Sequence, residues 1–315
     1  MRLSLRRFLH FRRCLTTLLV LGLSLPGTSM AWNGAGHRLI AVMAWQHMQP
    51  ATREWVSNQL ARHPDVARWQ EKGRQSGREN AAVDLFAEAA TWPDDIRQDP
   101  RFHDETRERA TPPVPGLPET ARRKRWHYVD LDAQGRVVAG ELDTRILDLT
   151  ARLRSTAGNT PESLILPWAL PWLVHLVGDV HQPLHVGKHG DEGGNLYEVE
   201  FDNRPRKPFG NLHQFWDDLP GPSGLRGQRL HEKAAWLLAT YPRPRPSAAA
   251  SWRDETHQLL AHAYPTRQGS LLPLIDPAFT AASRQLAEQQ LVKAGWRLAA
   301  LLDQIVHERV SRGTP

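Results

Sequence analysis

Histidine and aspartate recur in this sequence at spacings that suit a metal ion. Within residues 168–185, His175 and Asp179 are four positions apart, so on a helix both side chains project from the same face. His185 follows just after Pro183, where the helix is expected to end. The segment therefore offers two imidazoles and a carboxylate to one point in space, and these are ligands that zinc takes.

Side chains of the same chemistry lie elsewhere in the chain. His213 and Asp217 repeat the four-residue spacing in NLHQFWDD. The remaining candidates are Trp32 and His37 in WNGAGH, Asp94 in ATWPDDIR, and His127 in RWHYVDLD. One zinc ion takes about four ligands, and a catalytic zinc takes about three from the protein plus a water. So many nitrogen and oxygen ligands predict more than one metal ion, with a bridging carboxylate.

Helical periodicity dominates the elements that must position these ligands. Ala and Leu, which are good helix formers, are prominent in most of them. We expect helices at residues 36–48, 52–63, 81–96, 143–155, 163–180, 228–239, 251–262 and 281–309. Short strands are expected at 126–131 and 196–202. The pattern predicts a mainly α fold, with residues 32–315 forming a single catalytic domain.

The first 31 residues have the composition of a cleavable secretory signal. Five arginines precede an apolar run at residues 15–26 that is too brief to span a bilayer, and Ser29 and Ala31 are small residues where a signal peptidase reads. A membrane anchor is the alternative, and the paired Arg6 and Arg7 leave open a twin-arginine export route. Cleavage before Trp32 predicts a periplasmic or secreted protein with no stable membrane association.

Removing this segment changes the charge and the cysteine content. The chain has 40 Lys and Arg against 34 Asp and Glu, but five of the arginines lie in the first 31 residues, so the mature chain is close to neutral. Any attraction for phosphate must therefore come from a local site. The one cysteine, Cys14, also leaves with the signal, so the mature chain has no disulfides and is expected to be held by its core, by bound metal, or by both.

Taken together, these motifs resemble the zinc-dependent S1/P1-type nucleases, which are single-strand nucleases with 3′-nucleotidase activity. The resemblance rests on WxxxxH, WxD, HYVD, HxxxD followed by QPLH, and HQFWD, in this order from Trp32 to Asp218. It implies a helical fold shared with phospholipase C, a trinuclear zinc cleft, and a secreted bacterial enzyme that is expected to be a monomer.

The resemblance also divides the ligands among three zinc ions (Zn²⁺). The first ion would be held by Asp94, His127, His175 and Asp179, and the second by His185, His213 and Asp217. The third would be held by His37, by Asp179 as a bridge, and by the α-amino nitrogen and carbonyl oxygen of Trp32. Asp94 and Asp95 are adjacent and chemically equivalent, and the family pattern aligns Asp94.

Further residues are assigned to the substrate by the same resemblance. Arg97 would point its guanidinium at the phosphate and, with Asp94 and Asp179, is counted as catalytic; a surface arginine is the alternative. Tyr128 and Asp130 would face the same way in an extended segment. Tyr128 would then stack on a base and Asp130 would accept hydrogen bonds from it, whereas a half-buried edge strand is the alternative.

A few positions around the site have weaker assignments. Asn195, with the glycines before it, would shape a loop near the substrate or serve a purely structural role. Asp218 would repel phosphate if it lines the site. His181 is expected to be hydrogen-bonded rather than ligating, and Asp132 is expected to orient Arg97.

The implied function is endonucleolytic hydrolysis of phosphodiester bonds in single-stranded DNA and RNA, with 3′-nucleotides as further substrates. Attack on phosphorus would be in line and would leave 5′-phosphates. A zinc-dependent phospholipase C is one alternative, although HYVD favours a base pocket and no apolar rim stands out. A non-catalytic periplasmic zinc-binding protein is another, although the clustered ligands leave room for water.

Overall fold

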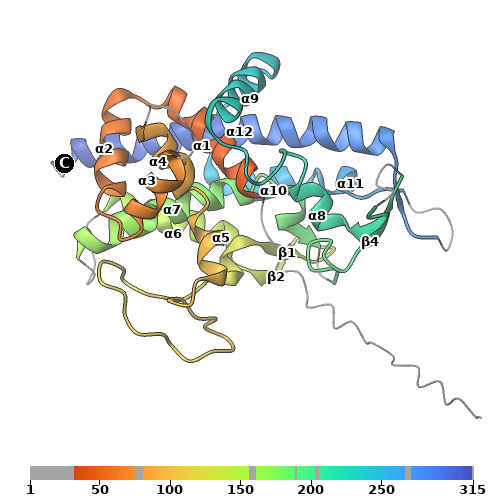
Figure 1. Cartoon of the computed structure of the whole chain (residues 1–315), viewed down its shortest axis with the longest axis horizontal. Helices are drawn as coiled ribbons and strands as arrows, with labels where there is room; N and C mark the ends of the chain where they lie inside the picture. Colours follow the sequence, from red (N-terminus) through yellow and green to blue (C-terminus); the bar gives the residue numbers. More distant parts are fainter. Residues whose placement is uncertain are drawn as a thin grey trace, which may run out of the picture.

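The computed structural model describes residues 32–74, 81–155, 161–188, 190–202, 206–266 and 271–313, so the expected signal segment lies outside the described residues. Helices make up most of this chain and strands are short (Figure 1), as the sequence predicts. The longer helices are α1 (Gly34–His47), α2 (Pro50–Leu60), α6 (Leu142–Arg154), α7 (Glu162–Asp179), α9 (Gly227–Thr240) and α12 (Pro277–Ser311). The shorter ones are α3 (Val66–Arg74), α4 (Ala81–Ala89), α5 (Trp92–Asp95), α8 (Leu212–Asp217), α10 (Ala249–His257) and α11 (Leu260–Ala263).

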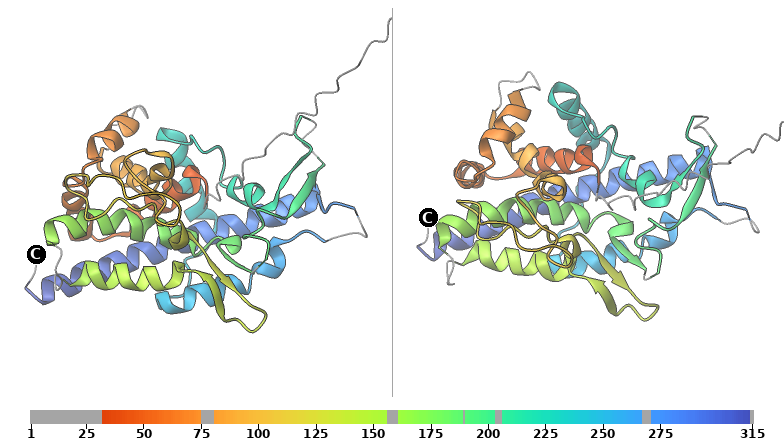
Figure 2. Two further views of the ribbon diagram at one scale, coloured as in Figure 1. Left: turned by 90° about the horizontal axis from the view of Figure 1, so that it is seen from below. Right: turned by 60° about the horizontal axis from the view of Figure 1, so that its bottom comes forward.

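Helix α12 runs through the molecule and packs against α1, α2, α6, α7 and α9. Figure 2 shows α6, α7 and α12 side by side as three long rods, with the N-terminal helices gathered at one end. The start of α12 is encoded locally, because the Asp276 side chain accepts a hydrogen bond from the Phe279 amide and Pro277 occupies the first turn. This helix buries Leu291, Leu298 and Leu302 in the core.

Helix α7 carries two of the predicted ligands through the middle of the core. It is apolar on nearly every face, as expected for a helix that is surrounded by others, and it ends at Asp179. Pro167 and Pro171 lie inside it. The sequence predicts these bounds to within a residue at each end.

Three predicted elements are wrong in detail. The single helix expected at 251–262 is divided into α10 and α11 by a turn at residues 258–259. The single helix expected at 81–96 is broken into α4 and α5 by a turn at Ala90 and Thr91, because Pro93 lacks an amide hydrogen and fits only the first turn of a new helix. The strand expected from residue 126 begins only at Val129, after a 3₁₀ turn η2 (Lys124–His127). Helices α3 and α8, of nine and six residues, were not among the predicted helices.

Two small sheets complete the fold. In the first, β1 (Val129–Leu131) pairs antiparallel with β2 (Val137–Gly140) and parallel with β3 (Val186–Lys188). In the second, β4 (Glu198–Phe201) lies between β5 (Phe209–Asn211) and β6 (Leu274–Ile275). The first sheet matters for the site, because its β1–β3 pairing brings η2 beside a second 3₁₀ turn, η3 (Pro183–His185). Across the described part of the chain, none of the helices combines the length and the apolar character that crossing a bilayer requires.

Candidate metal centre

Four of the predicted ligands converge on one buried point. His175 and Asp179 lie one turn apart on α7, Asp94 comes from α5, and His127 ends η2. Nδ1 of His127 lies 3.1 Å from both Nε2 of His175 and Oδ2 of Asp179, and the last two atoms are 3.3 Å apart. Oδ1 of Asp94 lies 3.8 Å from the His175 nitrogen and 3.9 Å from the His127 nitrogen. Ligands of a tetrahedral zinc ion are about 3.4 Å apart, because zinc binds nitrogen and oxygen at about 2.0–2.2 Å.

Asp179 also faces a second position. Its other carboxylate oxygen, Oδ1, lies 3.4 Å from Nε2 of His37 on α1. The His37 and His175 rings stack with centroids 3.8 Å apart. Gly178 permits this close approach, since a Cβ there would lie 2.8 Å from Nδ1 of His37. The two oxygens of one carboxylate therefore point to two adjacent places that could each hold a cation.

A separate group is formed by His185, His213 and Asp217. Nε2 of His185 lies 3.3 Å from Nε2 of His213, which in turn lies 3.4 Å from Oδ2 of Asp217. The short helix α8 presents the last two from one face, and Asn211 fixes its start by accepting a hydrogen bond from the Gln214 amide. The expectation that His175, Asp179 and His185 reach one point is thus wrong, because His185 is placed in a different group from the other two.

Backbone carbonyls orient three of the imidazoles. Nδ1 of His175 donates to the Ala90 carbonyl at 2.8 Å, and Nδ1 of His213 donates to the Gly193 carbonyl at 2.7 Å. His185 donates in the same way to the carbonyl of His127. With its proton held on Nδ1, each ring turns the lone pair of Nε2 toward its group, which is how outer hydrogen bonds set the tautomer of a metal ligand.

One hydrogen-bonding residue at the site was missed in the sequence analysis. Nε2 of Gln182 donates to Oδ1 of Asp217 at 3.1 Å, while its Oε1 accepts from the Leu184 amide. This leaves Oδ2 of Asp217 directed at His213. The only signal in the sequence was its place between His181 and Pro183 in the motif HQPLH.

The chemistry of these donors fits a bound cation. The imidazole and carboxylate ligands are all buried, and among the described residues Oδ1 of Asp94, Oδ1 of Asp179 and both ring nitrogens of His37 have no hydrogen-bond partner. Burial lowers the pKa of His37 and of His127 well below the usual value, so both rings are neutral ligands. Burial raises the pKa of Asp179 to about 6, and the nearby Asp94 carboxylate adds to this effect, although His175 and Arg97 oppose it. Zinc, with its preference for such ligands, fits the site.

Trp32 lies beside these groups at the start of α1. The residue is buried, and its Cβ approaches Gly36 so closely that a Cβ there would lie 2.5 Å away. The neighbouring Asn33 caps α1 by accepting from the Ala35 amide, donates its side-chain amide to the Gly221 carbonyl at 2.7 Å, and donates its backbone amide to the Asp217 carbonyl at 3.3 Å. The chain is therefore anchored beside the ligand Asp217 from its first described residues.

A buried ion cluster, formed by Arg38, Glu88 and Arg226, fastens the same region. The Glu88 carboxylate accepts from Arg38 at 2.7 and 3.2 Å and from Arg226 at 2.6 and 3.1 Å. Arg38 also donates to the Ser223 carbonyl at 2.8 Å. Arg38 directly follows His37, so the cluster holds α1, α4 and the loop after α8 together around the centre. Nothing in the sequence pattern pointed to it.

The two adjacent aspartates are separated by the fold. Asp94 is buried in the first group, whereas Asp95 is exposed and pairs with Lys72 at 2.6 Å. Arg97 lies beside Asp94, with Nε 3.1 Å from Oδ1, and only 7% of its side chain is exposed. This excludes the alternative of a surface arginine. The expected contact of Asp132 is wrong, because its carboxylate pairs with Arg136 in the β1–β2 turn.

The residues that the resemblance assigns to the substrate lie in several different elements. Tyr128 is half-buried just before β1, and burial together with the Asp130 carboxylate raises the pKa of its hydroxyl. Asp130 is buried on β1, opposite Gly187 of β3. Asn195 donates its side chain to the Glu192 carbonyl at 2.7 Å within its own turn, and Asp218 is exposed beside Asp217.

His181 does not ligate. Its Nδ1 donates to the Val177 carbonyl at 2.7 Å, and its Nε2 accepts from Arg297 at 3.0 Å. This agrees with the expectation of a hydrogen-bonded histidine.

Comparison with known proteins gives a consistent result. The family model described as S1/P1 Nuclease matches residues 32–307. Endonuclease 3 of Arabidopsis thaliana is 26% identical over 313 aligned residues, covering 93% of this chain and 95% of that protein. Endonuclease 1 of the same plant is 30% identical over 212 residues, covering 66% of this chain and 60% of that protein. Nuclease S1 of Aspergillus oryzae is 25% identical over 162 residues, covering 44% of this chain and 55% of that protein.

Proposed function

The chain belongs to the S1/P1 nuclease family, hydrolases that act on phosphodiester bonds, and from that premise we propose that it is a zinc-dependent endonuclease of single-stranded DNA and RNA. Its products would carry 5′-phosphates, and 3′-nucleotides would be further substrates. The observation that carries the proposal is the convergence of His and Asp ligands on three adjacent positions, with Asp179 shared between two of them.

Three zinc ions would occupy these positions. Asp94, His127, His175 and Asp179 would hold the first, and His185, His213 and Asp217 the second. His37, Asp179 and the amine and carbonyl of Trp32 would hold the third. Bound zinc supplies positive charge for phosphate oxygens and lowers the pKa of water.

The protein side chains would position the substrate. Arg97, held by Asp94, would place a guanidinium on the phosphate, where its planar donors suit two oxygens at once. Tyr128 would stack on a base, and Asp130 would accept from the base edge. Asn195 would line the approach. The exposed carboxylate of Asp218 would keep phosphate off its side of the site.

The location of the enzyme follows from the third position. Only cleavage after Ala31 frees the amine of Trp32, so we place the active enzyme in the periplasm or outside the cell, as a single catalytic domain that acts as a monomer.

One experiment tests the function directly. Zinc per chain would be counted on a sample with Trp32 at its N-terminus, and single-stranded DNA, RNA, 3′-AMP and phosphatidylcholine would be offered to the same sample. About three zinc ions with cleavage of nucleic acids and 3′-AMP are expected. Cleavage of lipid alone would move the protein to the phospholipases, and zinc without turnover would make it a zinc-binding protein.

A further inference from the structure

A turn at residues 191–195 holds one of the metal ligands through its backbone. Nδ1 of His213 donates to the carbonyl of Gly193 at 2.7 Å, and the backbone amide of His213 donates to the carbonyl of Gly194 at 3.2 Å. The two glycines have φ values of +62° and +82°, and a Cβ on Gly193 would lie 2.5 Å from the carbonyl oxygen of Leu184. Glycine is required here, yet it is also the residue with the most conformational freedom to lose.

The side chain of Asp191 closes this turn. Its Oδ1 accepts from the amide of Gly194 at 3.1 Å, and its Oδ2 accepts from the hydroxyl of Tyr264 at 2.6 Å. Lys188 approaches the same carboxylate only to 3.9 Å, with 53% of its side chain exposed, so this ion pair contributes little. Asp191 therefore links the turn to a tyrosine that lies 73 positions further along the chain.

Tyr264 is itself held in place. Its ring packs edge-on against the ring of Tyr197, with centroids 5.1 Å apart, and Nζ of Lys188 lies 4.2 Å from its centroid. Burial and the Asp191 carboxylate raise the pKa of the Tyr264 hydroxyl, so the hydroxyl keeps its proton and donates it to the carboxylate.

The segment that ends in this tyrosine also supports the other elements of the same ligand group. The carbonyl of Ala263 accepts from Nε1 of Trp216 at 2.9 Å, and Trp216 lies on α8 between the two ligands of that helix. Helix α11 packs against η3, which ends at His185. Because a helix of six residues has little stability of its own, α8 depends on such contacts.

We propose that Tyr264 and Asp191 are positioning residues for His213. By fixing the two-glycine turn, they keep the proton of the His213 ring on Nδ1 and its Nε2 directed at the zinc position of its group. Neither residue would contact the ion, since both act through the turn. The proposal rests on the proposed metal centre and extends it to a segment that no ligand spacing indicates.

The test removes one hydroxyl group. Zinc would be titrated away from the wild type and from Tyr264→Phe with a chelator, and amide hydrogen exchange of the peptide covering residues 190–197 would be followed by mass spectrometry. Loss of a hydrogen bond to a carboxylate should lower the affinity for one zinc ion about tenfold and leave the other ions unchanged. Exchange in that peptide should become faster.

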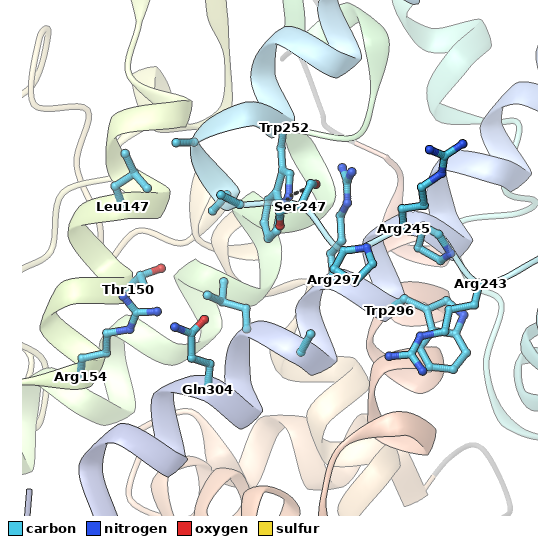
Figure 3. A pocket seen from close by; sticks show the side chains of 17 residues that line it. Leu147, Thr150, Arg154, Arg243, Arg245, Ser247, Trp252, Trp296, Arg297 and Gln304 are labelled. Atoms are coloured by element: carbon cyan, nitrogen blue, oxygen red, sulfur yellow. Dashed lines mark hydrogen bonds between the residues drawn. The ribbon is translucent and has the colours of Figure 1, made fainter. Parts of the chain in front are cut away.

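Two control variants lose a hydroxyl elsewhere. Tyr197→Phe keeps the ring that packs on Tyr264 and removes a hydroxyl that forms no hydrogen bond with the described residues. Thr150→Val removes a hydroxyl that donates to the carbonyl of Ile146 at 2.6 Å. Thr150 lines a cavity of about 440 Å³ between α6, α12 and residues 243–250, and none of the described residues that line it is a metal ligand (Figure 3). Both controls should bind zinc as the wild type does.

Two double variants show whether the effect passes through the turn to the ligand. In Asp191→Ala, the further change Tyr264→Phe should add nothing to the loss of affinity, because both act through the same contacts. In His213→Ala, which lacks one ligand of the group, Tyr264→Phe should not alter the affinity for the ions that remain.

The outcomes separate this proposal from the proposed function. Unchanged zinc affinity in Tyr264→Phe would overturn it, even with faster exchange in the turn, and so would an equal loss at every ion or a further loss in either double variant. A wild type that binds no zinc would contradict both proposals. Reduced affinity for one ion in Tyr264→Phe, in a protein whose wild type cleaves no nucleic acid, would contradict the proposed function alone.

Discussion

Oδ1 of Asp179 lies 3.4 Å from Nε2 of His37, although the two residues come from different helices of the core. The other oxygen of Asp179 lies 3.1 Å from His127 on the opposite side. The two oxygens of the Asp179 carboxylate thus face two neighbouring groups of ligands and connect them into one centre. Removing it should therefore affect both parts at once.

Replacement of Asp179 by Asn should release two of the three zinc ions, because the neutral amide lacks the negative charge that both ions would share and its nitrogen is not a zinc ligand. The group of His185, His213 and Asp217 does not use Asp179 and should keep its ion. Elemental analysis of the purified variant checks this. Loss of a single zinc ion would rule out the bridging role.

An added residue before Trp32 should abolish activity. The extra peptide bond removes the free amine from the third position, while Asn33 stays held by the Gly221 and Asp217 carbonyls. Zinc at His185, His213 and Asp217 should remain. Rates on single-stranded DNA and zinc content would be measured on the same sample, and full activity would eliminate the N-terminal ligand.

Substitution of Gln182 by Ala should weaken zinc binding at Asp217. Outer hydrogen bonds of this kind contribute about 10–100-fold to metal affinity or activity. Zinc affinity would be measured by competition with a chelator. The control is Gln214→Ala, an exposed residue on the ligand-bearing helix α8, which should have wild-type affinity. An unchanged affinity for Gln182→Ala would show that Asp217 is oriented by other contacts.

Substitution of Glu88 by Gln should destabilise the fold by about 3–5 kcal/mol, since it leaves the buried Arg38 and its neighbour Arg226 without their carboxylate. Urea unfolding of both proteins measures the difference. The control Glu71→Gln removes an exposed pair with Arg74, for which less than about 1 kcal/mol is expected. Equal effects of the two substitutions would contradict the role of the ion cluster.

Substitution of Tyr128 by Ala should raise KM for single-stranded DNA while turnover of a small phosphodiester without a base changes little. Loss of base stacking costs about 1–3 kcal/mol, or roughly 5–150-fold in affinity. Steady-state kinetics would give KM and kcat of the variant and the wild type on both substrates. A similar loss on both would argue that Tyr128 supports the fold rather than the base.

Most residues of the candidate site could be predicted from local spacing in the sequence. The four-residue intervals of His175 with Asp179 and of His213 with Asp217 place each pair on one face of a helix. The helix of His175 and Asp179 was predicted, whereas α8, which carries His213 and Asp217, was not among the expected helices. The three-residue interval from Asp94 to Arg97 likewise gives an ion pair. Periodicity also located the long helices, because each buries a continuous apolar face.

Contacts between segments that are distant in the sequence could not be predicted from local spacing. Gln182 meets Asp217, and Glu88 meets Arg226, only because α4, α7 and α8 pack around one centre. Asp132 was assigned to Arg97 by proximity in sequence, but the β1–β2 turn offered the nearer partner Arg136. Short elements such as α3 and η2 contain less than three turns, which is too short a stretch for an apolar pattern to be identified from sequence.

The position of helix α12 at the end of the chain determines when the metal centre can be completed. Helix α1, which carries His37, has its most extensive packing against α12. The ribosome makes α12 long after α1, so the ligands near the N-terminus lack the packing partner of their helix while the chain is still being made. The metal centre can therefore be completed only after α12 has been made, near the end of synthesis.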